Sequence, residues 1–262
     1  MASELARAVA RATAAKRAMV EAFNALAAVV DGVEAAAERG AINALLWECA
    51  AGQPVRSRFF SQYGQDAYLD THVFGSRRDG VFVDVGGFDG VTGSNTLFFE
   101  IFRGWRGLLV EAVDEHFEVA RSFRRCDCVQ ALVGDGAPAE FLTVDSGPVQ
   151  MSGLSASYDP KRRAWVDGQP NLSLRTEVRE TRLLADLLRA HHLHRVDLVS
   201  LDIEGAEAGV LAAFPFAEFE VECWCVETAE NPEPVAEIMI ANGYEWFERI
   251  GHDDLFVPRG RA

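Results

Sequence analysis

The chain has 262 residues and 49% of them are hydrophobic, enough to bury the core of one large domain or of a domain with an appendage. A formal net charge of -15 predicts an acidic surface that repels a phosphate backbone, which argues against a nucleic-acid partner. No apolar run reaches the ~20 residues of a membrane-spanning helix and no secretory signal is recognisable, so we expect a cytoplasmic protein without membrane contact. Five cysteines are an odd number for a disulfide framework, and we expect reduced thiols.

The first part of the chain, residues 1–54, is predicted to be a helical arm that precedes an α/β domain over 55–262. Alanine dominates the arm, apolar residues recur at a four-three spacing from Leu5 to Ala37, and the first proline is Pro54. Two interpretations stay open. The arm either forms a coiled coil that makes a homo-oligomer, or it folds back on its own domain as an amphipathic helix.

After Ser61 the sequence alternates between apolar strands and amphipathic helices. The predicted strands are 81–84, 107–110, 126–133, 139–144, 174–180, 196–201 and 220–226, the helices are 95–103, 114–123, 182–191 and 234–242, and a hairpin joins 244–248 to 255–257. This alternation predicts right-handed crossovers and a mainly parallel sheet covered on both faces, with one antiparallel strand added at the edge by the hairpin.

Residues 145–173 are rich in Gly, Ser, Pro and Asp and show no clear period. Loops of this length in a compact domain are usually functional or mobile. The segment is a candidate lid, in which an apolar wall over an acceptor comes from Met151, Leu154, Tyr158 and Trp165. A surface excursion is the alternative.

Four acids end predicted strands, namely Asp84, Glu111, Asp202 and Glu227. In sheets of this kind, ligands bind at the carboxyl ends of the strands, near the point where the strand order switches. The shared position of these acids is therefore the main indication of where a ligand binds.

A glycine loop, Gly86-Gly87-Phe88-Asp89-Gly90, follows the first of these strands and predicts a tight turn into a helix. Its glycines do not follow the G-x-G-x-x-G dinucleotide pattern, and Asp84 and Asp89 flank it, so a pyrophosphate would be repelled. A ligand that carries an ammonium and a sulfonium would not be, which favours S-adenosylmethionine over NAD. Glu111, at the end of the next strand, can accept hydrogen bonds from both ribose hydroxyls.

Several blocks together make the sequence resemble the FkbM family of methyltransferases over about residues 60–257. The matching blocks are Ser61-Gln62-Tyr63-Gly64-Gln65-Asp66, Val83 to Gly90 with Ser94-Asn95-Thr96, Gly107 to Glu111, Leu201-Asp202-Ile203-Glu204-Gly205-Ala206-Glu207, and Gly243-Tyr244. The family usually has a small residue and then asparagine after the first loop glycine, where this chain has Gly87-Phe88.

The resemblance implies a class I methyltransferase (Rossmann-like) fold, S-adenosylmethionine as methyl donor, and an acceptor hydroxyl on a sugar or a polyketide-type small molecule, less often an amine. It implies that Gly86, Asn95 and Glu111 line the cofactor and that Tyr63 and Gln65 cover it. Asp135 either accepts from the adenine amino group or is a turn acid in Val133-Gly134-Asp135-Gly136.

Methyl transfer to a hydroxyl requires loss of its proton, and two routes are open. Asp202, Glu204 and Glu227 offer oxygen ligands for Mg²⁺, which would lower the pKa of the acceptor hydroxyl. Alternatively, Asp202 contacts the cofactor ammonium and Glu204 and Glu207 serve the first turn of a helix.

The second route is a general base. His252, in the expected hairpin turn, is better placed than the histidines at 191, 192 and 194, which precede a strand. Asp202 and His252 are therefore the candidate catalytic residues. An NAD-type oxidoreductase and a non-catalytic scaffolding module are the competing functions; the first predicts a G-x-G-x-x-G run that is missing.

Overall fold

The computed structural model describes residues 59–144, 152–157, 174–229 and 232–260, and scattered residues between 15 and 28. Those scattered residues are helical. The rest of the predicted arm over 1–54, and with it the coiled-coil interpretation, lies outside the described residues.

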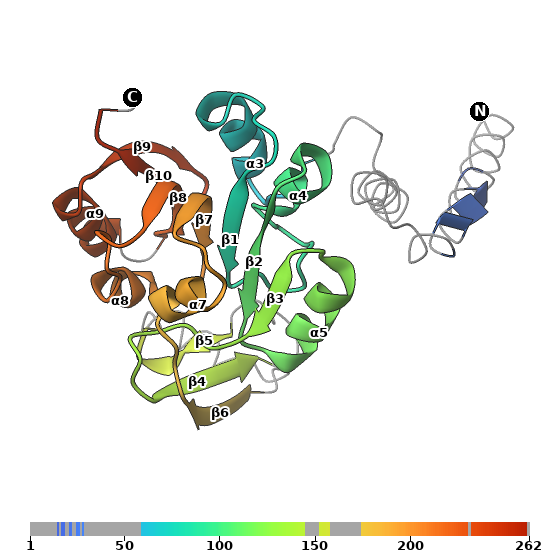
Figure 1. The fold of residues 1–262 in the computed structure, drawn as a ribbon. Coiled ribbons are helices and arrows are strands. Elements are labelled where there is room, and N and C mark those ends of the chain that lie inside the picture. Colours follow the sequence, from blue (N-terminus) through green and yellow to red (C-terminus); the bar gives the residue numbers. More distant parts are fainter. Residues whose placement is uncertain are drawn as a thin grey trace, which may run out of the picture.

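Within the described residues the main sheet has seven strands in the order β3-β2-β1-β7-β8-β10-β9, as the ribbon in Figure 1 shows. The strands are β1 (Val81–Val85), β2 (Arg106–Glu111), β3 (Asp127–Gln130), β7 (Arg195–Leu201), β8 (Glu220–Glu227), β9 (Tyr244–Ile250) and β10 (Asp253–Pro258). The first five in the row from β3 to β8 pair in parallel. The predicted α/β fold with a mainly parallel sheet is confirmed, and each strand of the sheet overlaps a predicted one.

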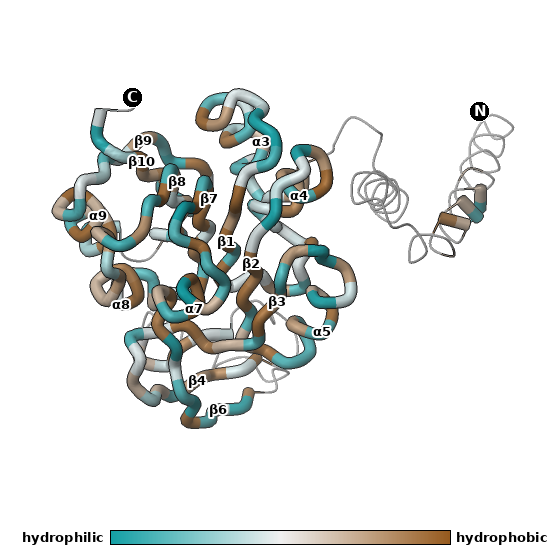
Figure 2. The backbone as a smooth tube through the Cα atoms, viewed as in Figure 1, coloured by the Kyte–Doolittle hydropathy of each residue, from teal (hydrophilic) through white to brown (hydrophobic). Residues whose placement is uncertain are grey.

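Helices cover both faces of this sheet because alternate strand residues are apolar on each side. One face packs against α7 (Leu184–Ala190), α8 (Glu207–Ala212) and α9 (Pro232–Ala241). The other packs against α4 (Leu97–Arg103) and the turn of π-helix Leu69–Val73 that continues α3 (Gln65–Tyr68), while α5 (Asp114–Phe123) contributes Phe123 there. In Figure 2 hydrophobic stretches run along β1, β2 and β3 in the middle of the domain. Among the described residues, no helix is both long and apolar enough to cross a bilayer.

The terminal hairpin differs from the prediction in one respect. Its antiparallel strand, β10, does not lie at the edge but between β8 and β9, and it is antiparallel to both. After α9 the chain forms β9 at the edge of the sheet and then returns as β10 between β9 and β8. Leu255 and Phe256 of β10 are fully buried there. The hairpin turn at Gly251–His252 is thereby brought next to the carboxyl end of β8, because Asp253 pairs with Glu227.

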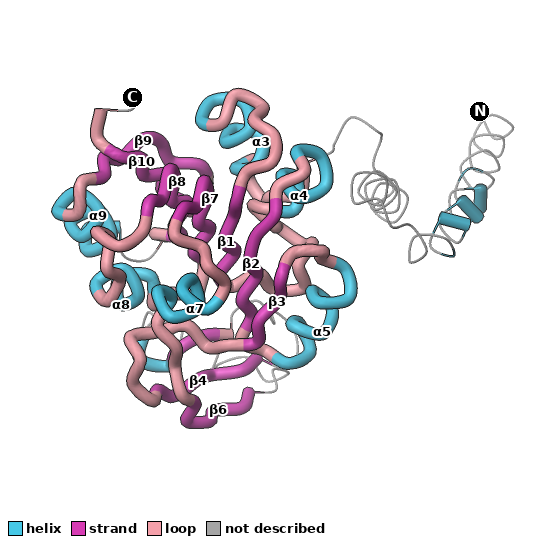
Figure 3. Tube along the Cα trace, viewed as in Figure 1, coloured by secondary structure: helices cyan, strands magenta, loops and turns pink. Residues whose placement is uncertain are grey.

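A second sheet of three antiparallel strands, in the order β5-β4-β6, is inserted between β3 and α7 (Figure 3). It consists of β4 (Ala139–Val144), β5 (Gly153–Leu154) and β6 (Leu174–Arg179), with a 3₁₀ turn at Ser155–Ser157. Strands β4 and β6 were expected from the sequence, but β5 and the pairing of the three strands into a separate sheet were not. Phe141 and Leu154 pack against Val113 and Leu132, so this small sheet lies against the carboxyl edge of the main one.

Candidate functional site

The described residues enclose a cavity of about 540 Å³ at the carboxyl edge of the main sheet. It lies where the strand order reverses, between β1 and β7, which is where ligands bind in open α/β sheets. The structure brings the four strand-end acids to this one cavity: Asp84, Glu111, Asp202 and Glu227.

The turn after β1 is shaped by Gly86, which lines the cavity at φ +83° and donates its N–H to the Val110 carbonyl at 2.9 Å. A Cβ at this position would overlap the backbone carbonyl oxygen of Asp202. Only glycine therefore allows the ends of β1 and β7 to approach this closely.

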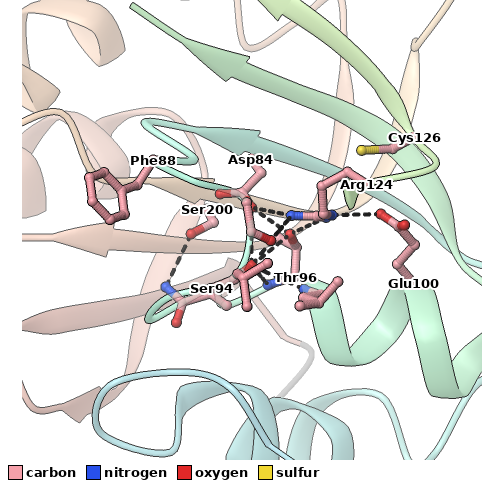
Figure 4. A network of polar contacts seen from close by, with 12 residues as sticks. Asp84, Phe88, Ser94, Thr96, Glu100, Arg124, Cys126 and Ser200 are labelled. Carbon is pink, nitrogen blue, oxygen red and sulfur yellow. Dashed lines mark hydrogen bonds and ion pairs between the residues drawn. The ribbon is translucent and has the colours of Figure 1, made fainter. Parts of the chain in front are cut away.

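Asp84 is held by one of its two carboxylate oxygens. Its Oδ2 accepts from Thr96 Oγ1 at 2.5 Å, from Arg124 Nη1 at 3.4 Å and from Ser94 Oγ at 3.5 Å (Figure 4). None of the described hydrogen bonds reaches Oδ1, and the residue lines the cavity. The fold thus fixes one oxygen and leaves the other for a ligand.

Arg124, just beyond α5, is the centre of this network and is buried, with 5% of its surface exposed. It donates to Glu100 Oε2 at 2.8 Å, to Thr96 Oγ1 at 2.9 Å and to the Gly90 carbonyl at 3.1 Å. Glu100 supplies the compensating charge for the buried guanidinium. Arg124 therefore ties the glycine loop, the start of α4 and Asp84 together.

Glu111, at the end of β2, is buried and accepts three backbone N–H groups. These come from Val113 and Ala112 on Oε1, at 2.7 and 2.9 Å, and from Phe88 on Oε2, at 2.9 Å. Burial nevertheless raises the pKa of Glu111 to about 7, with a smaller contribution from Asp84. Both oxygens are fixed in orientation at the cavity wall; Oε1 is committed to its two backbone N–H groups, and Oε2 keeps a lone pair that can accept a further hydrogen bond.

The segment before β1 covers the cavity through Tyr63 but not through Gln65. Tyr63 lines the cavity and its ring packs edge-on against His252, with 5.1 Å between centroids. Gln65 does not line it; its Nε2 donates to Asp253 Oδ2 at 2.5 Å and its Oε1 accepts the Tyr63 N–H at 2.8 Å. In the structure Gln65 thus holds the backbone of Tyr63 in place beside the cavity.

Asn95 lines the cavity and is only 8% exposed. Its Nδ2 donates to Ser200 Oγ at 3.1 Å and points at Cys225 Sγ at 3.7 Å. Its Oδ1 is buried without a hydrogen-bond partner among the described residues. A buried carbonyl left in this way costs free energy unless a ligand donates to it.

Asp135, the predicted adenine contact, is not among the residues that line the cavity. It is exposed, and its Oδ1 accepts the N–H of Ala137 at 3.0 Å within a turn. The reason is that β3 ends at Gln130, earlier than predicted. The wall beyond β3 is formed instead by Ala131, Leu132 and Val133.

The acids after β7 are arranged differently from the predicted metal set. Carboxylate oxygens of Asp202, Glu207 and Glu227 lie within 4.8 Å of one another, whereas Glu204 is not in this group and lines the cavity from the loop. Glu207 Oε1 already accepts the N–H of Ile203 at 2.8 Å, and burial raises the pKa of Glu207 to about 7. The pKa of Asp202 is also raised, by its enclosure in the protein and then by Glu227 and Glu204.

His252 lines the cavity from the β9–β10 turn, whereas His191 lies elsewhere, with Nδ1 3.2 Å from Asp127. Of the candidate lid, Leu154 lines the cavity; Met151, Tyr158 and Trp165 lie outside the described residues. Ser200, His116 and Phe141 are among the lining side chains that sequence reasoning missed. Phe88, at φ +49°, packs edge-on against His116 with 4.3 Å between ring centroids.

Comparison with solved structures finds distant likenesses. The TehB-like S-adenosylmethionine-dependent methyltransferase of Corynebacterium glutamicum is 12% identical, with 85% of this chain and 99% of that chain covered and a TM-score of 0.40. Methyltransferase FkbM of Methylobacillus flagellatus is also 12% identical, with 91% and 58% covered and a TM-score of 0.41. Fibrillarin of Aeropyrum pernix, with natively bound S-adenosylmethionine, is 11% identical, with 75% and 73% covered and a TM-score of 0.41.

A search of curated proteins found no match. The model of the methyltransferase FkbM domain, by contrast, matches residues 84–245, more than half of the chain. This range runs from Asp84, at the cavity, to the start of β9, and it contains Asn95, Glu111, Asp202 and Glu227. The chain belongs to the FkbM family of S-adenosylmethionine-dependent methyltransferases.

Proposed function

We propose that the cavity binds S-adenosylmethionine along the β2–β1–β7 edge and that the chain methylates a hydroxyl of a small molecule, such as a sugar or a polyketide-type metabolite, bound nearer β8. The observation that carries this proposal is that Glu111, Asp84 and the Gly86 turn line one cavity at the switch point of the sheet.

The residues present fit the cofactor group by group. Glu111 offers its Oε2, held in place by the Phe88 N–H, to the ribose hydroxyls, and the apolar wall of Leu132 and Val133 suits a purine ring. Asp84 offers its Oδ1 to an ammonium group, with Oδ2 held by Arg124 and its neighbours. When bound, the cofactor supplies an electrophilic methyl group, so the protein has mainly to orient the acceptor and take its proton.

Two groups that line the cavity, Asp202 and His252, are able to take that proton. Asp202 lies at the end of β7 and His252 opposite it in the hairpin turn, and both line the cavity. The raised pKa of Asp202, caused by its enclosure and by Glu227, brings the carboxylate closer to the basicity that suits a general base. Tyr63 fixes the His252 ring from the solvent side.

We infer that proton removal does not require Mg²⁺. The three converging acids include Glu207, whose Oε1 is already committed to two backbone N–H groups, from Ile203 and from Gly205 at 3.2 Å. That oxygen serves the entry into α8 rather than a metal. Of these three converging acids, Asp202 and Glu227 accept no backbone N–H group among the described hydrogen bonds, and two carboxylates are a small ligand set for a protein-bound divalent cation.

The test of this function is transfer of a tritiated methyl group from S-adenosylmethionine to a panel of hydroxylated small molecules, with product analysis by mass spectrometry. We expect an alkali-stable ether product, formed equally well in EDTA, and a loss of about 10²–10⁴-fold in turnover for Asp202→Asn or His252→Gln. An N-methylated product, or activity that EDTA abolishes and Mg²⁺ restores, contradicts this account. S-adenosylhomocysteine binding without transfer to any acceptor favours the non-catalytic module.

The affinity for S-adenosylhomocysteine is expected to rise with pH between about 6 and 8. Because the pKa of Glu111 is about 7 without ligand, its carboxyl is largely protonated at pH 6 and accepts fewer hydrogen bonds from ribose. Ionisation of this one group predicts a roughly tenfold lower dissociation constant at pH 8 than at pH 6. Asp84 on β1 also acts on Glu111 through its charge. His116 on α5 lines the same cavity. Burial lowers the pKa of His116, so its imidazole is neutral over most of this pH range.

Calorimetric titration at the two pH values measures this effect. Glu111→Gln is expected to bind about 10- to 100-fold more weakly at pH 8 and to lose the pH dependence, since a charge-assisted hydrogen bond contributes about 1.5–3 kcal/mol. The matched control is Glu237→Gln, on the exposed face of α9. Equal affinities of the wild type at pH 6 and pH 8 contradict the assignment of Glu111 to the ribose.

A further inference from the structure

His116 is the second polar side chain on the wall of the cavity where the ribose is proposed to bind. Of the lining residues between Arg106 and Val133, only Glu111 and His116 carry polar side chains, and the others are valine, alanine or leucine. His116 lies in the first turn of α5, which begins three residues after Glu111. Any side-chain hydrogen bond from this wall to a ligand therefore comes from one of these two residues.

Glu111 alone does not meet both hydroxyls of a ribose. Its Oε1 accepts the N–H groups of Val113 and Ala112, and its Oε2 accepts the N–H of Phe88 at 2.9 Å. A carboxylate oxygen has about two acceptor sites, so one site is left, on Oε2. A ribose diol has two O–H donors. Both can lie beside Oε2, but the second O–H needs a further partner at the same end of the cavity.

Phe88 holds the His116 ring beside Glu111. The two rings line the cavity and meet edge-on, at an interplanar angle of 64° with 4.3 Å between their centroids. Edge-to-face contacts of this kind favour one mutual orientation of two rings. Because the Phe88 N–H also binds Glu111 Oε2, a single residue of the glycine loop fixes both polar side chains of this wall.

The backbone of Phe88 supports a role in ligand binding. Its φ of +49° is left-handed, a conformation that a bulky L residue rarely adopts. Residues held in this way concentrate at sites that bind ligands. At Phe88 the strained conformation accompanies two contacts, one from the N–H to Glu111 and one from the ring to His116.

The imidazole of His116 suits a hydroxyl partner. Burial lowers the pKa of His116, against smaller opposite effects of Asp89 and Glu115, so the ring is neutral near pH 8. A neutral imidazole has one N–H donor and one acceptor nitrogen. It can therefore accept from a hydroxyl or donate to it, whereas a charged imidazolium can only donate.

We propose that His116 is a second ribose-binding residue: Glu111 Oε2 accepts one ribose hydroxyl of the cofactor, and a ring nitrogen of His116 meets the neighbouring hydroxyl. This proposal rests on the proposed function and deepens it. It makes the site selective for an adenosyl group whose two ribose hydroxyls are both free.

The first test compares ligands on the wild-type full chain by calorimetric titration at pH 8. S-adenosylhomocysteine is compared with its 2′-deoxy and 3′-deoxy forms. We expect one deoxy form to bind about 10- to 100-fold more weakly, the effect of losing the hydrogen bond to the charged Glu111. The other is expected to bind about 3- to 10-fold more weakly, the effect of losing a neutral hydrogen bond to His116.

The second test uses His116→Phe, which keeps a ring against Phe88 and removes both ring nitrogens. We expect it to bind S-adenosylhomocysteine about 3- to 10-fold more weakly than the wild type. The deoxy form with the smaller loss is expected to bind the variant and the wild type equally. The matched control is His72→Phe, because His72 is exposed and is not among the lining residues, and it is expected to leave every affinity unchanged.

Three results overturn the proposal. These are a deoxy form that binds the wild type as tightly as its parent, a His116→Phe variant with wild-type affinity, and a variant that weakens the parent and both deoxy forms equally, as a purely structural effect would. The ligand comparison on the wild type is decisive even where the variant does not fold. If S-adenosylhomocysteine itself fails to bind the wild type, the proposed function is contradicted instead, so the two failures are distinguishable.

Discussion

Gly86→Ala is expected to abolish measurable binding of S-adenosylhomocysteine and to lower the free energy of unfolding by about 2–5 kcal/mol, the sum of a left-handed alanine and an overpacked contact. The backbone at Gly86 has φ +83°, and an added Cβ would overlap the Asp202 carbonyl oxygen. Relief of this overlap requires the ends of β1 and β7 to separate. These two strands flank the switch point, so the separation widens the cavity where the cofactor is proposed to bind.

The matched control for this substitution is Gly260→Ala. Gly260 has the same φ of +83°, but a Cβ there would meet nothing within 4 Å. Gly260→Ala is therefore expected to lower the free energy of unfolding only by the cost of a left-handed alanine, about 1–2 kcal/mol. It is expected to leave ligand binding unchanged. Urea unfolding and calorimetry measure both quantities. If Gly86→Ala matches Gly260→Ala in both, the close approach of the two strands is unimportant.

Arg124→Met is expected to lower the free energy of unfolding by about 3–5 kcal/mol, because it leaves the buried Glu100 and Asp84 carboxylates without their cation. It is also expected to weaken S-adenosylhomocysteine binding roughly 10- to 100-fold, the effect of losing a charge-assisted hydrogen bond that orients Asp84. The glycine loop loses its tie at the Gly90 carbonyl in the same step.

A double variant separates stability from positioning. In Arg124→Met with Glu100→Gln, one uncompensated charge is removed, so part of the stability is expected to return. Binding of S-adenosylhomocysteine is expected to stay weak, because Asp84 is still not held. Urea unfolding and calorimetry on the three variants measure this pattern. Recovery of affinity together with stability would show that Arg124 acts only on the fold and does not position Asp84.

Much of the sheet was predictable because its signals are local. The runs predicted as strands, 81–84 and 196–201, and the acids Asp84 and Asp202 at their ends are visible in the sequence, and parallel strands bring their carboxyl ends to one edge. The position of β10 was not predictable in this way. The hairpin sequence predicts that β9 and β10 are neighbours, but it does not predict which of the two strands lies next to β8.

The site residues divide in the same way, into those that the local sequence indicates and those that only the fold brings together. Glu111 was identified from its place at a strand end, a property of the chain alone. Arg124 was missed because a single arginine after a helix gives no signal until the fold buries it against Glu100 and the glycine loop. Gln65 was assigned to the cofactor by resemblance, yet its partner is Asp253, at the far end of the sequence. Only the three-dimensional arrangement reveals such a contact.

The measurement that tests the central claim most directly is the crystal structure of the chain bound to S-adenosylhomocysteine. We expect both ribose hydroxyls within hydrogen-bond distance of Glu111, the adenine against Leu132 and Val133, and the amino group at Asp84 Oδ1. The sulfur should face Asp202, with the end of the cavity next to Glu227 on β8 left free. An adenosine bound at the β8 side of the cavity, or contacting neither Glu111 nor Asp84, would contradict the account.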